Sequence, residues 1–346
     1  MAGLPEVVAN EEELDALLTE PTEEVERALA GVEGDLLILG VGGKMGPTLA
    51  QLARRAVVRA GLGKRVIGVS RFSSPELEQQ LRVSGVETIA CDLLAERALD
   101  DLPDASNVIY MVGRKFGTSA AQAQTWATNS YLPGLVAQRY RASRLVVLSS
   151  GNVYPLVPVT SGGATERQPP GPIGEYAQSC LGRERVCEYF SRQYGTPMAI
   201  IRLNYAIDLR YGVLLEVATR VWAGEPIDVT MGNVNVIWQG DANRMILQAF
   251  RLCTSPPDVL NVTGPETVSI RHIATRFAEL FGRPAPLFSG DEAPTALLSN
   301  AQRAYSLFGY PAIPLERMLR WVAHWVMQGG RTWDKATHFE VRDGNF

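Results

Sequence analysis

A run of glycines between an apolar segment and a helical segment is the first feature with recognisable chemistry. The stretch Asp35-Leu-Leu-Ile-Leu-Gly-Val-Gly-Gly-Lys-Met-Gly46 places Gly40, Gly43 and Gly46 at GxxGxxG spacing, and Gly42 adds a G-x-G start. Such a turn has no side chains in the way, and the N–H groups of the following helix favour an anion. The pattern predicts a pyrophosphate site, although an ordinary strand-to-helix turn has the same spacing.

Two kinds of element must position this turn. Leu36 to Leu39 are uninterrupted apolar residues, which suits a central parallel strand buried on both faces, and residues 45–59 mix apolar and basic residues at helical spacing. Strand and helix patterns then alternate as far as residue 203, which predicts an α/β fold with a doubly wound parallel sheet. The further predicted strands are 65–71, 86–93, 106–113, 144–150 and 198–203, and the further helices are 95–101, 120–141 and 176–194.

The end of the second predicted strand carries residues that select between two dinucleotides. Sites of this kind often place an acidic residue there to bind the adenosine ribose, whereas an arginine accommodates a 2′-phosphate. The positions are Ser70 and Arg71 here, and an arginine beside small hydroxyl donors favours NADP over NAD. The alternative is that Arg71 stacks on an adenine or extends into solvent.

Composition and charge exclude several classes of protein. The 346 residues carry a formal net charge of −4, whereas proteins that track nucleic-acid phosphates carry a basic face, so no nucleic-acid partner is expected. The chain has no apolar run of membrane-spanning length and its N-terminus is acidic, so we expect a cytoplasmic protein that does not bind membranes. Cys91, Cys180, Cys187 and Cys253 form no C-x-x-C pair, and we expect neither a metal site nor a disulfide framework.

Changes of pattern divide the chain into three parts. Residues 1–34 contain two short acidic segments with leucines at helical spacing and with Thr19 and Thr22 as caps. They predict a helical extension that packs on the fold, covers a partner or solubilises the chain. Residues 35–203 form the predicted dinucleotide-binding domain, and residues 204–346 are expected to be mainly substrate-binding, with segments that can return to the first domain. The elements predicted there are helices 211–223, 240–252, 270–281 and 314–327 and strand 260–263.

Six short motifs together resemble those of the extended short-chain dehydrogenase/reductases, in particular their NAD(P)-dependent sugar epimerase/dehydratase branch. The motifs are the glycine turn, Asp92-Leu93, Thr128-Asn-Ser-Tyr-Leu-Pro-Gly134, Leu148-Ser-Ser-Gly-Asn-Val-Tyr154, Gly174-Glu-Tyr-Ala-Gln-Ser-Cys180 and Arg202-Leu-Asn-Tyr205. The resemblance extends from about residue 35 to about residue 325. It implies a Rossmann sheet with a smaller C-terminal α/β substrate domain, a bound NADP or NAD, a small sugar-like substrate and a homodimer formed through two long helices.

The resemblance implies hydride chemistry at a carbinol carbon, with Ser150 and Tyr176 at the reacting oxygen. A phenol with a pKa near 10 removes a hydroxyl proton at neutral pH only if its phenolate is stabilised, and the family uses a lysine four residues later for this purpose. That position is Cys180 here, so the lysine of the Y-x-x-x-K pattern is absent. Three explanations stay open: Lys115 substitutes for the missing cation, Tyr176 acts as a neutral donor while another group is the base, or the protein binds cofactor without turning it over.

The resemblance also implies which residues contact the ligands. The expected cofactor contacts are Gly40, Gly43, Lys44, Met45, Gly46, Ser70, Arg71, Asp92, Leu93, Val112, Gly113, Lys115, Asn129, Tyr176 and Leu203. Lys44 either meets the pyrophosphate as a point charge or extends into solvent beside it. The expected substrate contacts are Asn152, Asn204, Arg210 and Trp238. Epimerases that act on nucleotide sugars commonly carry an arginine at the position of Val234, so the sequence leaves open whether the sugar is nucleotide-linked.

These expectations combine into one function and one rival. The chain is predicted to be an NAD(P)-dependent oxidoreductase or epimerase that acts on a hydroxyl or keto carbon of a sugar or sugar-like polyol through Ser150 and Tyr176. The rival is a catalytically impaired NADP-binding sensor or scaffold, because the glycine turn is kept and the lysine is lost. None of the three histidines is assigned to catalysis.

Overall fold

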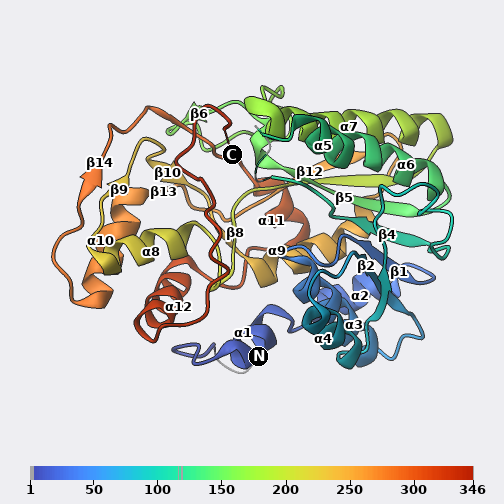
Figure 1. Ribbon diagram of the computed structural model, residues 1–346, viewed down its shortest axis with the longest axis horizontal. Coiled ribbons are helices and arrows are strands. Elements are labelled where there is room, and N and C mark those ends of the chain that lie inside the picture. The colour runs from blue at the N-terminus through green and yellow to red at the C-terminus, as the bar shows by residue number, and fades with distance from the viewer. Residues whose placement is uncertain (1–3, 116, 118–119, 346) are drawn as a thin grey trace.

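The computed structural model describes residues 4–115, 117 and 120–345 of the chain. A seven-stranded parallel sheet forms its first lobe, in the order β12-β7-β5-β4-β1-β2-β3 (Figure 1). The strands are β1 (Leu36–Leu39), β2 (Val66–Ser70), β3 (Glu87–Ala90), β4 (Asn107–Tyr110), β5 (Arg144–Ser150), β7 (Met198–Leu203) and β12 (Asp258–Val262). The strand order reverses between β1 and β4, which confirms the predicted doubly wound sheet and creates a crevice at the carboxyl ends of these two strands.

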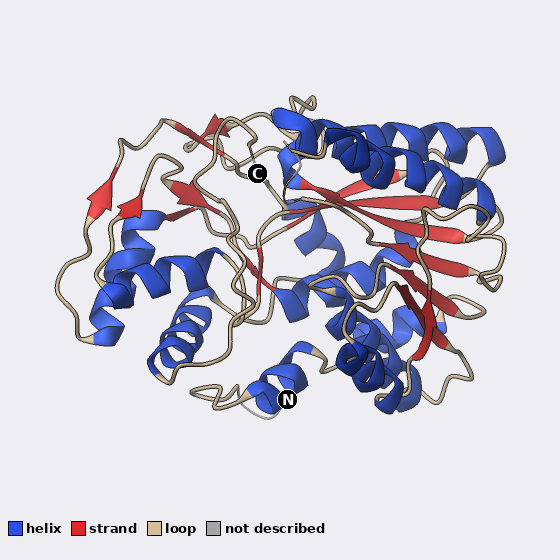
Figure 2. Cartoon of the chain, viewed as in Figure 1, coloured by secondary structure: helices blue, strands red, loops and turns tan. Residues whose placement is uncertain are grey.

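Apolar side chains on both faces of the sheet explain why helices cover it from two sides (Figure 2). All four residues of β1 are buried, as expected for a central strand. The helices on one face are α5 (Gln122–Trp126), α6 (Leu132–Arg139) and α7 (Gly174–Tyr194). Those on the other face are α2 (Glu23–Ala30), α3 (Gly46–Arg59), α9 (Gln239–Gln248) and α11 (Gln302–Phe308), and α4 (Pro75–Val83) packs beside β3.

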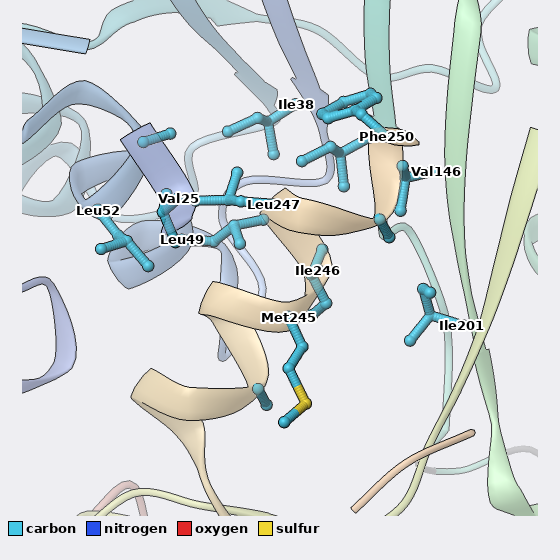
Figure 3. Packing of buried hydrophobic residues seen from close by; sticks show 14 of the residues in the cluster. Val25, Ile38, Leu49, Leu52, Val146, Ile201, Met245, Ile246, Leu247 and Phe250 are labelled. Atoms are coloured by element: carbon cyan, nitrogen blue, oxygen red, sulfur yellow. The ribbon is translucent and has the colours of Figure 1, made fainter. Parts of the chain in front are cut away.

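The late part of the chain returns to the first lobe through α9. Its residues Met245, Ile246 and Leu247 project between α3 and the central strands, where Leu49 and Ile201 belong to the same buried cluster (Figure 3). Burying one aliphatic side chain of this size contributes about 1.5–3 kcal/mol. Because α9 and β12 both lie C-terminal to β7, the expected substrate-binding region also builds part of the dinucleotide-binding lobe.

The second lobe surrounds a second apolar cluster. Trp238 and Trp321 pack edge to face in this cluster, with ring centres 5.2 Å apart. Its helices are α1 (Glu11–Leu18), α8 (Val213–Ala223), α10 (Ile270–Phe281) and α12 (Leu315–Met327). Short strands pair as β6 (Val157–Pro158) with β15 (Thr295–Ala296), β8 (Ala206–Ile207) with β11 (Ile237–Trp238), β9 (Ile227–Asp228) with β14 (Phe288–Ser289), and β10 (Asn233–Val234) with β13 (Val268–Ser269).

The N-terminal extension packs on the fold. Both expected helices are present as α1 and α2, and Thr22 caps α2 by accepting the Val25 N–H at 3.5 Å. Thr19 is the C-cap of α1 instead, and its hydroxyl donates to the Asp15 carbonyl at 2.6 Å. α1 buries its leucines in the second lobe and α2 buries its apolar residues in the first. The extension therefore connects the two lobes.

The prediction of a helix over residues 95–101 is wrong. This segment forms consecutive turns, and Arg97 has a φ of +60°. A helix of this length is marginal without strong packing. Asp100 and Asp101 would also place negative charge at the carboxyl end, where the helix dipole is negative.

Two further elements differ from the sequence expectations. α4 was not predicted, although Ser74 caps its first turn and Pro75 occupies its first position, which are both common start signals. The helix predicted over residues 120–141 is divided into α5, a π-helical turn (Ala127–Tyr131) and α6. π-helical turns often occur at functional sites, and this one carries Asn129.

Beyond α12, residues 328–345 contain no helix or strand. Figure 1 shows this dark red segment running back between the two lobes toward the amino end of α7. Gly344 and Gly174 approach so closely there that a Cβ on Gly174 would lie 2.4 Å from the carbonyl oxygen of Gly344. The C-terminal segment therefore joins the second lobe to the helix that carries Tyr176.

Candidate active site

The glycine turn forms one wall of the site. Gly40 has a φ of +91°, which favours glycine, and a Cβ there would lie 2.9 Å from the backbone nitrogen of Val112. Gly46 lets α3 approach the turn, since a Cβ there would lie 2.2 Å from the carbonyl oxygen of Val41. No described residue caps the start of α3 with its side chain, so the N–H groups of its first turn are available to an anion.

A long cavity of about 540 Å³ runs along the carboxyl ends of β1, β2, β3 and β4. Its volume lies within the range of about 300–1,000 Å³ that is typical of ligand sites. The expected cofactor contacts in its lining are Gly40, Gly43, Ser70, Arg71, Asp92, Leu93, Val112, Gly113 and Lys115. An open glycine turn beside a cavity that crosses four strand ends fits an extended dinucleotide.

Ser70, Arg71 and Ser73 form the end of the long cavity that follows β2. The Arg71 side chain is exposed, and Asp92 lies at the neighbouring end of β3. Asp92 Oδ1 accepts the Leu94 N–H at 3.1 Å, so this carboxylate already supports its own turn. Arg71, the two hydroxyls and the Asp92 carboxylate all border this end of the cavity.

A small cavity of about 200 Å³ adjoins the long one, and Lys115 lines both. The expected site residues in its lining are Lys44, Met45, Lys115, Ser150, Asn152, Tyr176, Leu203 and Asn204. The three predicted catalytic residues are thus brought together from β5, α7 and the loop after β4. Gly46, Asn129, Arg210 and Trp238 line neither cavity.

Ser150 and Tyr176 are hydrogen-bonded to each other in the small cavity. Ser150 Oγ donates to Asn152 Oδ1 at 3.0 Å and accepts the Asn152 N–H at 3.2 Å. The bond to Ser150 lowers the pKa of Tyr176, but by less than burial raises it. Burial, with a smaller effect from Cys180, raises the pKa of the Tyr176 phenol above its usual value near 10. The phenol is therefore a neutral proton donor in these surroundings.

Three of the chain's four lysines meet where the two cavities join. Lys115 Nζ donates to the carbonyl of Thr337 at 2.9 Å, and burial lowers the pKa of Lys115 to about 8. Lys44 Nζ lies 3.2 Å from the centre of the Tyr211 ring. Burial, followed by repulsion from Lys115 and Lys335, lowers the pKa of Lys44 to about 7. The junction of the cavities therefore favours a ligand with negative charge.

Asn129 supports the loop that carries Lys115. Its Oδ1 accepts the Arg114 N–H at 2.8 Å, and its Nδ2 donates to the Arg114 carbonyl at 2.9 Å. Nδ2 also donates to Ser179 Oγ on α7 at 2.9 Å. The residue was expected to contact the cofactor, but the structure places it behind the cavity, where it joins this loop to α7.

A buried network beneath the small cavity holds α7 to the sheet. Ser149 Oγ donates to Glu184 Oε1 at 2.5 Å, and Glu184 pairs with Arg202 at 2.6 Å. Arg202 Nη1 donates to the Tyr154 hydroxyl at 2.8 Å, and this hydroxyl donates to Asn261 Oδ1 at 2.8 Å. The network joins β5, α7, β7 and β12, and it fixes the distance between the strand that carries Ser150 and the helix that carries Tyr176.

The structure places two of the expected substrate contacts outside both cavities. Arg210 is buried and pairs with Asp208 at 2.8 Å and with Asp15 of α1 at 3.0 Å. Its guanidinium joins the N-terminal extension to the second lobe. Trp238 is 1% exposed, because its large apolar ring is buried in the apolar cluster of the second lobe. Its neighbour Gln239 lines the small cavity instead.

Several residues of the site, including the following four, were not found from the sequence. Tyr211, Lys335 and Thr337 line the cavities, and Glu216 of α8 accepts the Thr337 N–H. Burial raises the pKa of the Glu216 carboxyl. The sequence did contain one signal for Lys335. Almost all of the 33 basic residues are arginine, so the few lysines stand out. A compact ammonium serves different chemistry from a guanidinium.

Two other kinds of site are absent from the described part of the chain. No group of three or more His, Cys, Asp or Glu residues there could hold a metal ion. Within the same residues, no helix has both the length and the apolar character needed to cross a bilayer.

Comparisons with known proteins agree with this geometry. Residues 36–223 match the model of the NAD dependent epimerase/dehydratase family. The fold is similar to that of UDP-glucose 4-epimerase of Thermotoga maritima with UDP-glucose, at 17% identity and a TM-score of 0.70, with 85% of this chain and 99% of that chain covered. No curated protein sequence matches the chain.

Two further solved structures share the fold. One is UDP-glucuronic acid 4-epimerase from Bacillus cereus in complex with UDP-glucuronic acid and NAD, at 18% identity and a TM-score of 0.69, with 85% of this chain and 99% of that chain covered. The other is dTDP-glucose 4,6-dehydratase from Bacillus anthracis in complex with NAD, at 14% identity and a TM-score of 0.70, with 86% and 97% covered. At such identities the structures establish the fold, whereas the family model covers more than half of the chain. The chain belongs to the NAD dependent epimerase/dehydratase family.

Proposed function

We propose that the chain is an NAD(P)-dependent oxidoreductase or epimerase that acts on a hydroxyl or keto carbon of a sugar-like substrate, with Ser150 and Tyr176 at the reacting oxygen. The observation that carries this proposal is the hydrogen-bonded Ser150–Tyr176 pair in a small cavity that shares Lys115 with the long cavity. A bound nicotinamide dinucleotide supplies hydride transfer at the substrate carbon. The residues of the chain then act on the oxygen and its proton.

Tyr176 is the proton donor in this proposal. Its neutral phenol is hydrogen-bonded to Ser150, and a substrate oxygen placed beside the pair can take the phenol proton. Ser150 orients that oxygen, and Asn152 fixes the rotamer of Ser150 through two hydrogen bonds. Burial raises the pKa of Tyr176, which supports the second explanation for the missing lysine, a neutral phenol that polarises a keto oxygen.

Lys115 supplies the cation that Cys180 cannot. The Lys115 ammonium and the Cys180 thiol are close enough for each to shift the pKa of the other, and Cys180 is hydrogen-bonded to Tyr176. A positive charge there stabilises the phenolate that remains after Tyr176 has given up its proton. The thiol is 1% exposed and fills the space below the phenol.

The preferred dinucleotide in this proposal is NADP. Arg71, Ser70 and Ser73 are grouped where a 2′-phosphate would lie, at the end of the long cavity. The long cavity also accommodates NAD, with Arg71 against the adenine face.

Tyr176→Phe is the decisive test of catalysis. Removing the hydroxyl is expected to lower turnover of a substrate by about 100- to 10,000-fold, because proton transfer is lost, while NADP binding stays within about threefold of wild type. Turnover is followed by absorbance of the reduced nicotinamide together with product analysis, since an epimerase regenerates its cofactor internally. Binding is measured by calorimetry. Unchanged turnover in the variant would exclude Tyr176 as the donor.

The rival function has its own outcome in the same assays. A sensor or scaffold binds NADP with a saturable heat signal and converts no sugar in a broad panel. Cys180 in the position of the family's lysine is the observation that favours it. If wild type converts any sugar of the panel and Tyr176→Phe does not, the protein is an enzyme and the sensor or scaffold is excluded.

A further inference from the structure

The C-terminal strap, residues 331–345, borders each of three neighbouring cavities. Lys335 lines the long cavity and Thr337 lines the small cavity. Val341, Arg342 and Gly344 line a third, narrow cavity, which shares lining residues with the small one. In Figure 1 the strap passes between the two lobes in front of the carboxyl ends of the strands.

The first half of the strap is held by groups of the active site. The Trp333 N–H donates to the Arg210 carbonyl at 3.0 Å, and the Trp333 ring stacks on Tyr211 with centres 6.1 Å apart. Thr337 is held on both sides of its backbone: its N–H donates to Glu216, and its carbonyl accepts from Lys115 at 2.9 Å. The strap is therefore in direct contact with the proposed catalytic cation.

The second half of the strap is held as firmly. Arg342 Nη1 donates to the Thr295 carbonyl at 2.7 Å, and Arg342 Nη2 donates to Thr295 Oγ1 at 2.6 Å. Arg342 Nη1 also reaches the Thr230 carbonyl at 3.2 Å. Phe339 is 2% exposed and belongs to the apolar cluster of the second lobe. The strap is an integral part of the folded second lobe.

The strap limits the space beside Ser150 and Tyr176. The small cavity holds about 200 Å³. The narrow cavity continues from it past Asn152 and Tyr205 and holds about 20 Å³. Sites for drug-sized ligands hold about 300–1,000 Å³, so this space suits a single sugar. A nucleoside diphosphate attached to that sugar would need volume that the strap occupies.

The charged groups on this side of the site favour the same conclusion. Arg210 and Arg342 are both engaged with protein groups, and Val234, buried in the second lobe, brings no charge. Lys44 and Lys115 line the small cavity, and the Glu216 carboxylate, which accepts the Thr337 N–H, acts on both ammonium groups. Two ammonium groups in so small a cavity attract one compact anionic group.

We propose that the substrate is a single unlinked sugar with one anionic group, bound by Lys44 and Lys115 beneath the C-terminal strap. The inference rests on the proposed function, since it places the reacting carbon at Ser150 and Tyr176. The anionic group is a carboxylate or a phosphate, which share the negative charge and the oxygen acceptors that ammonium groups bind. In this proposal the strap limits the size of the substrate, and the two lysines select its negative charge.

The test measures binding to the full-length protein saturated with NADP, by calorimetry and without reference to turnover. The panel contains free hexonates and hexuronates as carboxylates, hexose 6-phosphates as phosphates, neutral hexoses, and UDP-glucuronate. At least one free anionic sugar is expected to bind at least about tenfold more tightly than both its neutral counterpart and UDP-glucuronate. Comparison of the carboxylate sugars with the phosphate sugars shows which anionic group the site prefers. Tighter binding of UDP-glucuronate, or no binding of any free anionic sugar, overturns the proposal.

Two lysine variants separate charge recognition from general effects. Lys44→Met is expected to weaken binding of the anionic sugar by about 10- to 100-fold and to leave binding of the neutral sugar unchanged. Lys64→Met is the matched control, because Lys64 bonds the Val32 and Gly34 carbonyls, away from the cavities. Equal losses for the anionic and the neutral sugar would contradict the role of Lys44.

Arg342→Ala tests the strap while the chain keeps its full length. Loss of the bonds to Thr295 and Thr230 is expected to raise the affinity for UDP-glucuronate relative to that for the free anionic sugar. An unchanged ratio in a variant that is still folded would show that the strap does not set the size limit. If a free anionic sugar binds but is not converted, the proposed function fails and this inference stands. If a UDP-sugar binds and is converted, only this inference fails.

Discussion

The residue one helical turn after Tyr176 is Cys180, whereas the family pattern has a lysine at this position. The Cys180 thiol is buried and cannot carry the charge that a lysine would bring. Two cations act on this pair: Arg183 of the same helix lowers the pKa of both Tyr176 and Cys180, and Lys115, from the loop after β4, lowers that of Cys180. We therefore expect cofactor binding to survive substitutions that abolish turnover.

The pKa of Lys44 leads to a prediction about stability. Burial and neighbouring lysines lower its pKa to about 7 in the folded protein from 10.5 in the unfolded chain, so its ammonium destabilises the ligand-free fold at low pH. This cost is fully present below pH 7 and is lost as the pH rises from 7 toward 10.5, because only the unfolded chain is then protonated. Lys44→Met should be more stable than wild type at pH 6, with a gap that narrows by pH 9.

The measurement is urea unfolding of both proteins, without ligands, at several pH values. Arg97→Met serves as the control, since Arg97 is 80% exposed and lies outside both cavities. A gap that widens between pH 7 and pH 9 would contradict the assignment of Lys44 as a buried cation.

Arg71 gives a second prediction at this scale. Arg71→Ala should weaken NADP binding by about 10- to 100-fold and NAD binding much less, because a charge-assisted bond to the 2′-phosphate is lost. Calorimetric titration with each dinucleotide measures the ratio. Arg97→Ala is a suitable control, since Arg97 is equally cationic, 80% exposed and outside both cavities. Equal losses for NADP and NAD would favour stacking of Arg71 on the adenine.

At the scale of elements, α7 carries the proposed catalytic tyrosine and also holds the fold together. Its first turns carry Tyr176 and Cys180, and its next turns carry Arg183 and Glu184, which bond to the sheet and the π-helical turn. Arg183 Nη1 donates to the Leu148 carbonyl at 2.5 Å. The buried side of α7 thus combines paired polar groups with apolar contacts, and the polar pairs attach the helix to the sheet.

Glu184→Ala should lower the free energy of unfolding by about 3–5 kcal/mol, because Arg202 would keep a buried charge without its carboxylate. Glu188→Ala on the same helix is the control. Glu188 forms ion pairs with Arg185 and Arg192 at the surface, and its loss should cost about 1 kcal/mol or less. Urea unfolding measures both. Similar effects of the two variants would show that the buried pair adds little to the attachment of α7.

At the scale of the molecule, the two lobes are interwoven and not joined in series. α9 and β12 return to the first sheet, α1 reaches the second lobe, and the strap runs from α12 to α7 (Figure 1). Each cavity is consequently lined by segments that are far apart in the sequence. Separate expression of residues 35–203 would leave the sheet without its edge strand β12.

The outer face formed by α5, the π-helical turn, α6 and α7 leads to a prediction about assembly. Trp126 of α5, Tyr131 of the π-helical turn and Tyr189 of α7 are exposed, and the first two line an apolar groove of about 440 Å³. A homodimer is expected to cover this face. Tyr131→Asp should shift the mass measured by light scattering from dimer to monomer. Tyr310→Asp is the control, because Tyr310 is 65% exposed outside this face. A wild-type monomer at micromolar concentration would contradict the expectation.

The sequence alone determined the features that depend on neighbours along the chain. The apolar run of β1, the glycine turn and the amphipathic α10 follow from short-range pattern, and each was predicted close to its observed bounds. Ser150 and Tyr176 could be placed because a motif identifies each of them. The prediction of a helix over residues 95–101 was wrong because the helical pattern there is short and its charges oppose the helix dipole.

Only the tertiary structure decided which side chains share a space. Arg210 and Trp238 are residue types that often contact substrates. In the structure, however, Arg210 pairs with a carboxylate of α1 and Trp238 packs on a ring of α12. Both partners are distant in the sequence. The meeting of Lys44, Lys115 and Lys335 and the position of the strap depend on the same kind of contact. Periodicity and motifs report the surroundings of a residue along its own element. The size and charge of the substrate site come from elements that only folding brings together.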